Sequence, residues 1–168
     1  MTLALSSAEA VAFLPVAAAV GGWVMVSDLR EMRIPNRAVL ALLAAFIAIG
    51  VFLLPPETLA WRLGQGLAVL AIGFLFNMAG LLGAGDAKFA AAMAPFVAPA
   101  DALLVLMVFA GLTAISLVLH RLALVVPGLK AQLAKWASWQ RLREFPMGVP
   151  LALTLIVYLA LGLGNGPA

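Results

Sequence analysis

Five stretches of the chain are long and apolar and contain no charged residue. They are residues 10–27, 38–54, 63–82, 102–119 and 147–164. A helix that crosses a bilayer needs about 20 predominantly apolar residues, with about 17 as the lower limit, and each stretch meets that length. The lipid interior offers no partners to backbone N–H and C=O groups, so such stretches must be helical. The pattern therefore predicts an all-α integral membrane protein.

A sixth apolar stretch, residues 89–100, is shorter and is interrupted by Pro95 and Pro99. At about 1.5 Å per residue, a helix of this length covers little more than half of a hydrocarbon core about 30 Å thick. It spans the membrane only if adjoining residues contribute, so we expect a short or tilted fourth helix. The sequence predicts six transmembrane helices, with five as the alternative, in a single membrane-embedded domain over residues 1–168.

The composition excludes several other classes of protein. Hydrophobic residues make up 65% of the chain and charged residues only 10%, whereas soluble domains have about 25% charged residues. This excludes a soluble domain, a disordered tail and a nucleic-acid-binding protein. The chain has no cysteine and one histidine, His120, so a disulfide framework, a thiol nucleophile and a histidine metal cluster are excluded as well. Any chemistry must come from carboxylates, hydroxyls or water, and we expect no metal and no cofactor.

The basic residues indicate the orientation in the membrane. In a six-helix topology the first, third and fifth connections lie on one side, and they hold nine of the ten Lys and Arg residues; Arg62 lies opposite. Cytoplasmic connections of membrane proteins are enriched in Lys and Arg. We therefore expect these three connections in the cytoplasm and both termini outside. The nine residues are Arg30, Arg33, Arg37, Lys88, Arg121, Lys130, Lys135, Arg141 and Arg143.

The fifth connection, residues 120–146, is long for such a short chain. Leu129, Leu133 and Trp136 share one face at helical spacing. Lys130 and Lys135 point elsewhere. A mixture of Trp and Lys suits a helix that lies in the headgroup region. We expect a cytoplasmic loop with an interfacial amphipathic helix, and a surface anchor is favoured over a substrate-binding element.

Several polar residues have ordinary structural explanations. Gln65 and Asn77 lie within the predicted third helix, where interhelical hydrogen bonds are expected. Asp101 and Glu57 are expected to mark the ends of outside loops, and His120 is expected at the membrane interface.

Two acids stand out from the others by their position at the membrane boundary. Asp28 lies where the first predicted helix ends, and Asp86 lies just after the third, two spans later and therefore on the same side. Ionisable groups beside hydrocarbon are costly, and they usually serve a function or pair with an opposite charge. Pairing could involve Arg30 or Arg33 for Asp28, and Lys88 for Asp86.

The residues around these acids favour a functional site. Asp86 ends the sequence Gly-Ala-Gly-Asp at 83–86, whose glycines let backbone or substrate approach the carboxylate closely. Asp28 is followed by Ile-Pro-Asn at 34–36, and proline there disfavours helix at the preceding residue. Both acids are thus expected beside sharp turns at the membrane surface.

These motifs, together with Phe-Pro-Met-Gly at 145–148, resemble the type IV prepilin peptidase family, the G-x-G-D class of intramembrane aspartyl proteases. The short length resembles the minimal tight-adherence (Flp pilus) branch. The resemblance implies a G-x-G-D protease-type helical bundle whose catalytic aspartates are Asp28 and Asp86. It also implies supporting roles for Gly83, Gly85, Lys88, Pro35, Asn36, Pro146 and Gly148.

The resemblance further implies the substrate and its location. The substrate is a prepilin with a basic leader and a hydrophobic helix, cut at the cytoplasmic face of the bacterial inner membrane. Larger members of the family carry a cysteine-rich cytoplasmic region and also methylate the new N-terminus. This chain has no cysteine, so methyltransferase activity is not predicted.

A function from another class remains as the alternative. The two acids could serve as ion or proton sites in a transporter, or in a non-enzymatic scaffold for pilus assembly. A transporter needs a polar path across the bilayer, and within the predicted helices only Gln65 and Asn77 offer one.

Overall fold

The computed structural model describes residues 3–126, 128, 132–141 and 144–165. The described residues form helices and the turns between them, with no β-strand. The elements in chain order are α1 (Ser7–Glu31), α2 (Asn36–Leu53), α3 (Pro56–Met78), α4 (Ala84–Met93), the 3-10 turns η1 (Ala94–Phe96) and η2 (Pro99–Asp101), α5 (Ala102–Leu122), α7 (Ala137–Gln140) and α8 (Gly148–Gly162). The predicted all-α fold is therefore confirmed.

Four helical segments of the described chain are long and apolar enough to cross a membrane: Ser7–Glu31, Asn36–Leu53, Pro56–Met78 and Pro99–Leu122. The other two predicted spans correspond to shorter helices. α8 has 15 residues and α4 has 10. The helix lengths thus support four of the six predicted spans, and the count of six stays a prediction.

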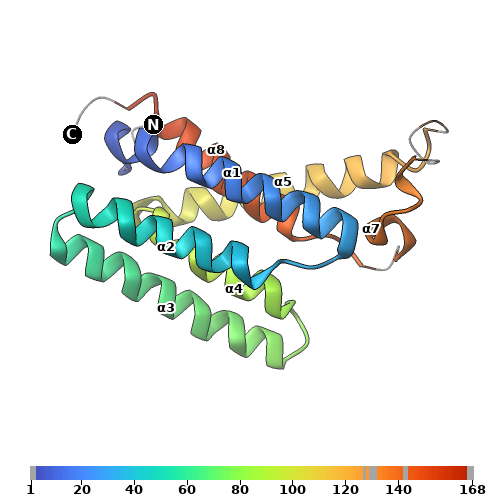
Figure 1. The fold of residues 1–168 in the computed structure, drawn as a ribbon, viewed down its shortest axis with the longest axis horizontal. Coiled ribbons are helices and arrows are strands. Elements are labelled where there is room, and N and C mark those ends of the chain that lie inside the picture. The colour runs from blue at the N-terminus through green and yellow to red at the C-terminus, as the bar shows by residue number, and fades with distance from the viewer. Residues whose placement is uncertain (1–2, 127, 129–131, 142–143, 166–168) are drawn as a thin grey trace.

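The helices pack as two groups around a shared core (Figure 1). α1, α5 and α8 lie together along one side, and the α2–α3 hairpin lies along the other with α4 between. Where the groups meet, the rings of Phe13, Phe46 and Phe96 contact one another with centroids 5.0–5.4 Å apart. Aromatic pairs at such distances add to the stabilisation from burial. They join α1, α2 and η1.

α4 ends in backbone that is not α-helical, and side chains from other helices bind it. Pro95 and Pro99 interrupt the helical pattern, as the sequence suggested. The side chain of Gln65 donates to the carbonyls of Ala94 and Val97, which confirms its predicted interhelical bonding. Non-helical backbone in a membrane protein is tolerated where the protein itself supplies the missing hydrogen bonds.

Arg62 and Glu9 provide further support for this break. Arg62 donates to the Pro95 carbonyl at 3.2 Å and pairs with Glu9 at 3.1 Å, and both charged side chains are buried. Glu9 also completes a capping box with Ser6 at the start of α1. The sequence analysis placed Arg62 on the outer side and assigned no role to Glu9; the structure places both side chains in the interior.

Asp101 is buried, contrary to the expectation of a loop-end charge. Its carboxylate accepts hydrogen bonds from the backbone N–H groups of Ala4 and Leu5 and from the hydroxyl of Tyr158, the last at 2.8 Å. The Tyr158 oxygen also accepts from the N–H of Ala98. Hydropathy placed Asp101 at a helix end but could not show that three donors converge on it.

The connection after α5 folds back against α1. His120 is buried within the protein, and its ring stacks on Trp139 with centroids 4.5 Å apart; its position at the membrane interface stays a prediction. Trp136 precedes α7 with extended backbone, and Arg30 of α1 lies over its ring. Leu129 and Lys130, on which the predicted amphipathic helix depends, lie outside the described residues; that helix stays a prediction.

Candidate active site

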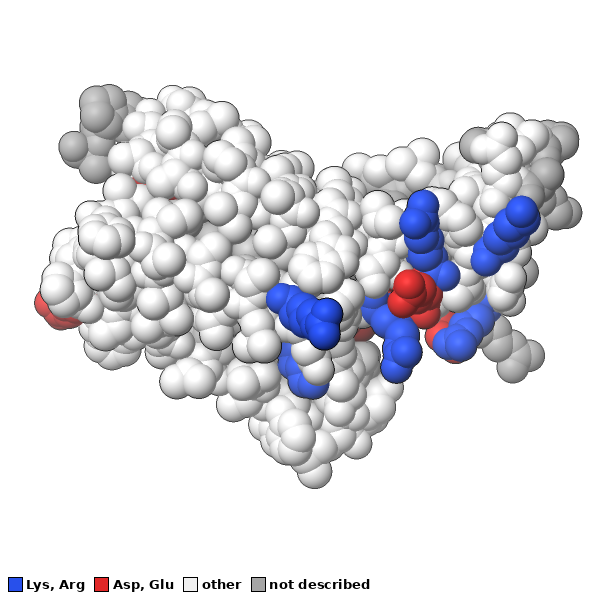
Figure 2. Space-filling view, in the orientation of Figure 1, with Lys and Arg blue, Asp and Glu red and all other residues white. Residues whose placement is uncertain are grey.

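Asp28 and Asp86 line the same cavity, although they come from different helices and are far apart in sequence. The cavity has a volume of about 1040 Å³ and lies where the end of α1 meets the start of α4. Figure 2 shows that the visible Lys and Arg side chains gather over one half of the molecular face. Seven of the nine predicted site residues line this cavity: Asp28, Asp86, Gly83, Gly85, Lys88, Pro35 and Asn36.

Asp28 lies in the last turn of α1 and is only 5% exposed. A carboxylate at this end of a helix faces the negative end of the helix dipole, which is unfavourable. The first N–H of α8 compensates for this, because Gly148 donates to Oδ2 of Asp28 at 2.7 Å. The carboxylate of one helix is thus bound by the positive N-terminus of another.

Gly148 has no room for a side chain. A Cβ atom there would lie 2.9 Å from Oδ2 of Asp28 and 3.1 Å from Cγ1 of Val24. The sequence identified this glycine only by resemblance. The structure gives it a physical role, since it brings the backbone of α8 against Asp28.

Asp86 is the third residue of α4, and Gly83 is the N-cap. Its carboxylate accepts a hydrogen bond from the backbone of Gly83, as an acid at this position commonly does. Burial, followed by the negative charge of Asp28, raises the pKa of the Asp86 carboxyl from its ordinary value of 3.8 to about 6, while the Gly83 bond lowers it. The electrostatic influence of Asp28 is expected when two acids share a site.

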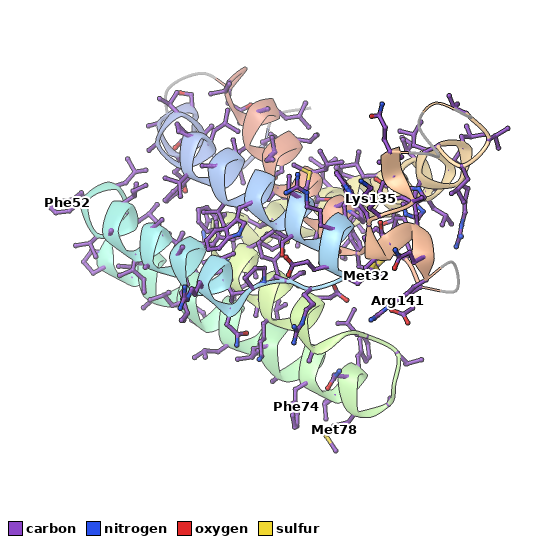
Figure 3. All side chains as sticks on the ribbon, turned by 45° about the vertical axis from the view of Figure 1, so that its right-hand side comes forward. Met32, Phe52, Phe74, Met78, Lys135 and Arg141 are labelled. Atoms are coloured by element: carbon purple, nitrogen blue, oxygen red, sulfur yellow. The ribbon has the colours of Figure 1, made fainter. Side chains whose placement is uncertain are left out.

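The turn between α1 and α2 forms one wall of the cavity. The C-cap residue after α1 is Met32, which has a left-handed backbone with φ 54°. The Ser27 hydroxyl donates to the Arg33 carbonyl at 2.9 Å. Met32 lies at this end of α1 in Figure 3. Ile34 then packs directly on Gly85, where an added Cβ would lie 3.4 Å from that of Ile34. The two motifs of the sequence therefore contact each other.

Two of the three basic residues considered as partners of the acids bind elsewhere. Lys88 donates to the Asn36 side chain at 3.4 Å, and Arg30 lies over Trp136. Within the described part of the chain, neither Asp28 nor Asp86 forms a salt bridge. Simple charge pairing does not account for the two acids.

Two predicted residues, Pro146 and Gly148, lie beside the cavity without lining it. Pro146 is buried two residues before α8, and its carbonyl accepts a hydrogen bond from the N–H of Val149 in the first turn of that helix. Their neighbours Phe145 and Met147 do line the cavity, and the sequence analysis gave them no role. Residues that line the cavity therefore alternate with residues that do not along this segment.

The site offers two carboxylates and no nucleophilic side chain activated by a base. In the part of the chain that the structure describes, no group of three His, Cys, Asp or Glu residues is placed to hold a metal ion. Two acids in one cavity can share a proton, so that one acts as a base and the other as an acid. This arrangement suits hydrolysis by water.

Comparison with known sequences agrees with this geometry. The model of the type IV leader peptidase family matches residues 15–119, a range that includes both acids and the 83–86 motif. Searches among curated proteins and among solved structures each gave no match. The matched range covers well over half of the 168 residues, and the chain therefore belongs to the type IV leader peptidase family.

Proposed function

We propose that this protein is an aspartic endopeptidase that removes the leader peptide from type IV prepilins of the Flp kind, using Asp28 and Asp86. The observation that carries the proposal is the shared cavity: α1 and α4 each place one carboxylate in it. Backbone groups at Gly148 and Gly83 bind and orient these carboxylates. Membership of the leader peptidase family agrees with peptide hydrolysis.

The two acids would act on a water molecule between them. One carboxylate removes a proton from the water as its oxygen attacks the scissile carbonyl carbon, and the other, protonated, donates to the carbonyl oxygen. The resulting gem-diol collapses when the amide nitrogen accepts a proton and leaves as an amine. The pKa values of such a pair belong to both acids together, so the roles of base and acid are not divided between them here.

The position of the cavity suits a substrate that is cut at the membrane boundary. Arg33 and Lys88 from the first and third connections line it, and connections rich in such residues face the cytoplasm. In the proposed topology of six spans, the cavity therefore faces the cytoplasm of the bacterial inner membrane. Glu31 also lines the cavity and is exposed, so it can attract a basic leader.

The two polar residues that could extend a transport path have other partners. Gln65 bonds to the backbone after α4, and Asn77 donates to the Leu82 carbonyl at 2.8 Å, in the turn that follows α3. The Asn77 bond is local, in contrast to the interhelical bond expected from the sequence. The side-chain amides of both residues donate to backbone carbonyls, while Oε1 of Gln65 is buried without a hydrogen-bond partner in the described part of the chain. These structural bonds favour the peptidase over a transporter.

The test is processing of a co-expressed Flp prepilin, followed by mass spectrometry of the product. Asp28→Asn and Asp86→Asn should each abolish cleavage while the protein remains inserted in the membrane. Glu57→Gln is the matched control because Glu57 is an exposed acid outside the cavity. Cleavage at the wild-type rate by either aspartate variant would show that the pair is not catalytic. Wild-type protein that never cleaves in purified form would favour the scaffold.

A further inference from the structure

A second cavity of about 570 Å³ lies between α2, α3 and α4. It is an open groove whose walls are almost wholly apolar. The walls come from one stripe of α2 and one of α3, and alanines of α4 form its base. The groove is lined by Asn36, Val39, Leu40, Leu43 and Ile47 of α2, by Leu63, Gly66, Leu67 and Leu70 of α3, and by Lys88, Ala91 and Ala92 of α4.

The groove is continuous with the cavity that holds the two acids. Asn36 and Lys88 line both, and their side chains are joined by a hydrogen bond at 3.4 Å. Lys88 follows Asp86 by two residues on α4, and Ala91 and Ala92 lie about one turn further along the same helix. A chain leaving the acids along α4 therefore passes Lys88 and enters the groove.

The dimensions and chemistry of the groove suit an apolar helix. The α2 stripe runs from Asn36 to Ile47, which corresponds to about 16 Å of helix at 1.5 Å per residue. Ala91 and Ala92 keep the base shallow, and small residues let helices approach closely in lipid. Leu40 and Leu67 form exposed edges, at 64% and 69% exposure. In Figure 3, Phe74 and Met78 of α3 point outward from the bundle.

We propose that this groove binds the hydrophobic helix that follows the scissile bond of the substrate, an inference that rests on the proposed peptidase function. With the scissile bond between Asp28 and Asp86, the polar leader remains in the polar cavity and the apolar helix continues into the groove. The Lys88–Asn36 pair marks the boundary between the two. The groove thus selects substrates whose hydrophobic segment begins directly after the cleavage site.

Cross-linking tests the location. The chain has no cysteine, so Leu67→Cys introduces a single thiol at the edge of the groove. The probe is a synthetic peptide with a basic leader, the cleavage site and an apolar helix carrying one cysteine, and Asp86→Asn prevents its cleavage. Ile115→Cys on α5, 56% exposed and outside the groove, is the control. We expect a disulfide adduct with Leu67→Cys and none with Ile115→Cys.

Two other results would overturn the inference. Equal or absent adducts at both positions would mean that the helix does not lie in the groove, which is then filled by lipid. A disulfide between two copies of Leu67→Cys that persists when the probe is present would place a second copy of this chain there instead.

Kinetics separate failure of this inference from failure of the proposed function. The second probe is a short peptide that spans the scissile bond and lacks the apolar helix. Leu67→Trp should raise the KM of the helix-bearing probe about 10-fold more than that of the short probe, because the larger side chain at the edge of the groove obstructs a helix that lies in it. Ile115→Trp should change neither KM. If wild-type protein cleaves both probes and Leu67→Trp changes both KM values by the same factor, only the groove assignment fails. If wild-type protein cleaves neither, the peptidase function fails and the groove assignment with it.

Discussion

The backbone N–H of Gly148 donates a hydrogen bond to Oδ2 of Asp28 at 2.7 Å, between residues 120 positions apart. This bond ties the start of α8 to the end of α1. It places a helix N-terminus, with its partial positive charge, against a carboxylate that lies at the C-terminus of its own helix. The catalytic role proposed for Asp28 therefore depends on a residue near the other end of the chain.

Gly148→Ala should reduce kcat/KM for prepilin cleavage while the protein still folds. The added Cβ would lie 2.9 Å from Oδ2 of Asp28, so the carboxylate or the start of α8 must shift. A displacement of about 1 Å at a catalytic group can cost about 100-fold in rate. Gly64→Ala is the control, because a Cβ there meets nothing within 4 Å. Equal rates for the two variants would show that the close approach at Gly148 does not matter for catalysis.

Asp86→Asn should stabilise the folded protein at a pH well above 6 and have little effect below 3.8. The Asp86 carboxyl has an ordinary pKa of 3.8 and a pKa of about 6 in the fold. Between these values the unfolded chain loses the proton while the folded chain keeps it, so stability falls as the pH rises through this window. The asparagine variant does not ionise and avoids this loss.

Thermal unfolding in detergent measures the difference. The unfolding midpoint temperature of Asp86→Asn should exceed that of wild type at a pH above 6. The two midpoints should become equal at a pH below 3.8. Gly64→Ala, which changes no ionisable group and meets nothing within 4 Å, should shift the midpoint equally at every pH. A midpoint difference that is constant with pH would contradict the raised pKa.

The apolar runs located most of the helices, but they could not set where each helix ends. The run at 38–54 became α2, Asn36–Leu53, almost unchanged. The run at 10–27 became Ser7–Glu31, because a capping box extends its start and polar residues continue its last turn. The run at 63–82 ends earlier, before Gly80 at φ 72°. Hydropathy indicates which residues tolerate lipid, and caps and turns decide the boundaries.

The candidate site was predictable because its motifs combine acids with glycines and proline at the membrane boundary. The buried polar contacts that join distant elements could not be predicted. Glu9 and Arg62 are 53 residues apart, and Asp101 contacts the chain 97 residues earlier. A single sequence shows that such charges exist, but their partners follow from helix packing. For this reason the sequence treated Asp101 as a loop charge although it is buried.

Arg62→Leu should destabilise the protein by about 3–5 kcal/mol, because it leaves Glu9 buried without its partner. Both side chains are nearly inaccessible, at 6% and 10% exposure. The double variant with Glu9→Leu removes the unpaired charge as well and should recover part of this loss. The free energy of unfolding can be measured by titrating SDS into mixed micelles.

Arg141→Ala provides the contrast. The ion pair between Arg141 and Glu144 is 3.7 Å long, and both side chains are more than half exposed. Exposed pairs contribute about 1 kcal/mol or less. Similar losses for Arg62→Leu and Arg141→Ala would show that burial does not determine the strength of the Arg62–Glu9 pair.

Tyr158→Phe should cost about 1–3 kcal/mol, because it leaves the buried N–H of Ala98 without its acceptor. It also removes the donor to Asp101, whose carboxylate keeps the bonds from Ala4 and Leu5. Thr154→Val is the matched control: it removes a buried hydroxyl that bonds only to the Pro150 carbonyl within α8, so no distant group loses a partner. SDS titration should therefore give a larger loss for Tyr158→Phe than for Thr154→Val. Equal losses would mean that the Tyr158 hydroxyl does not hold the segment between α4 and α5 in place.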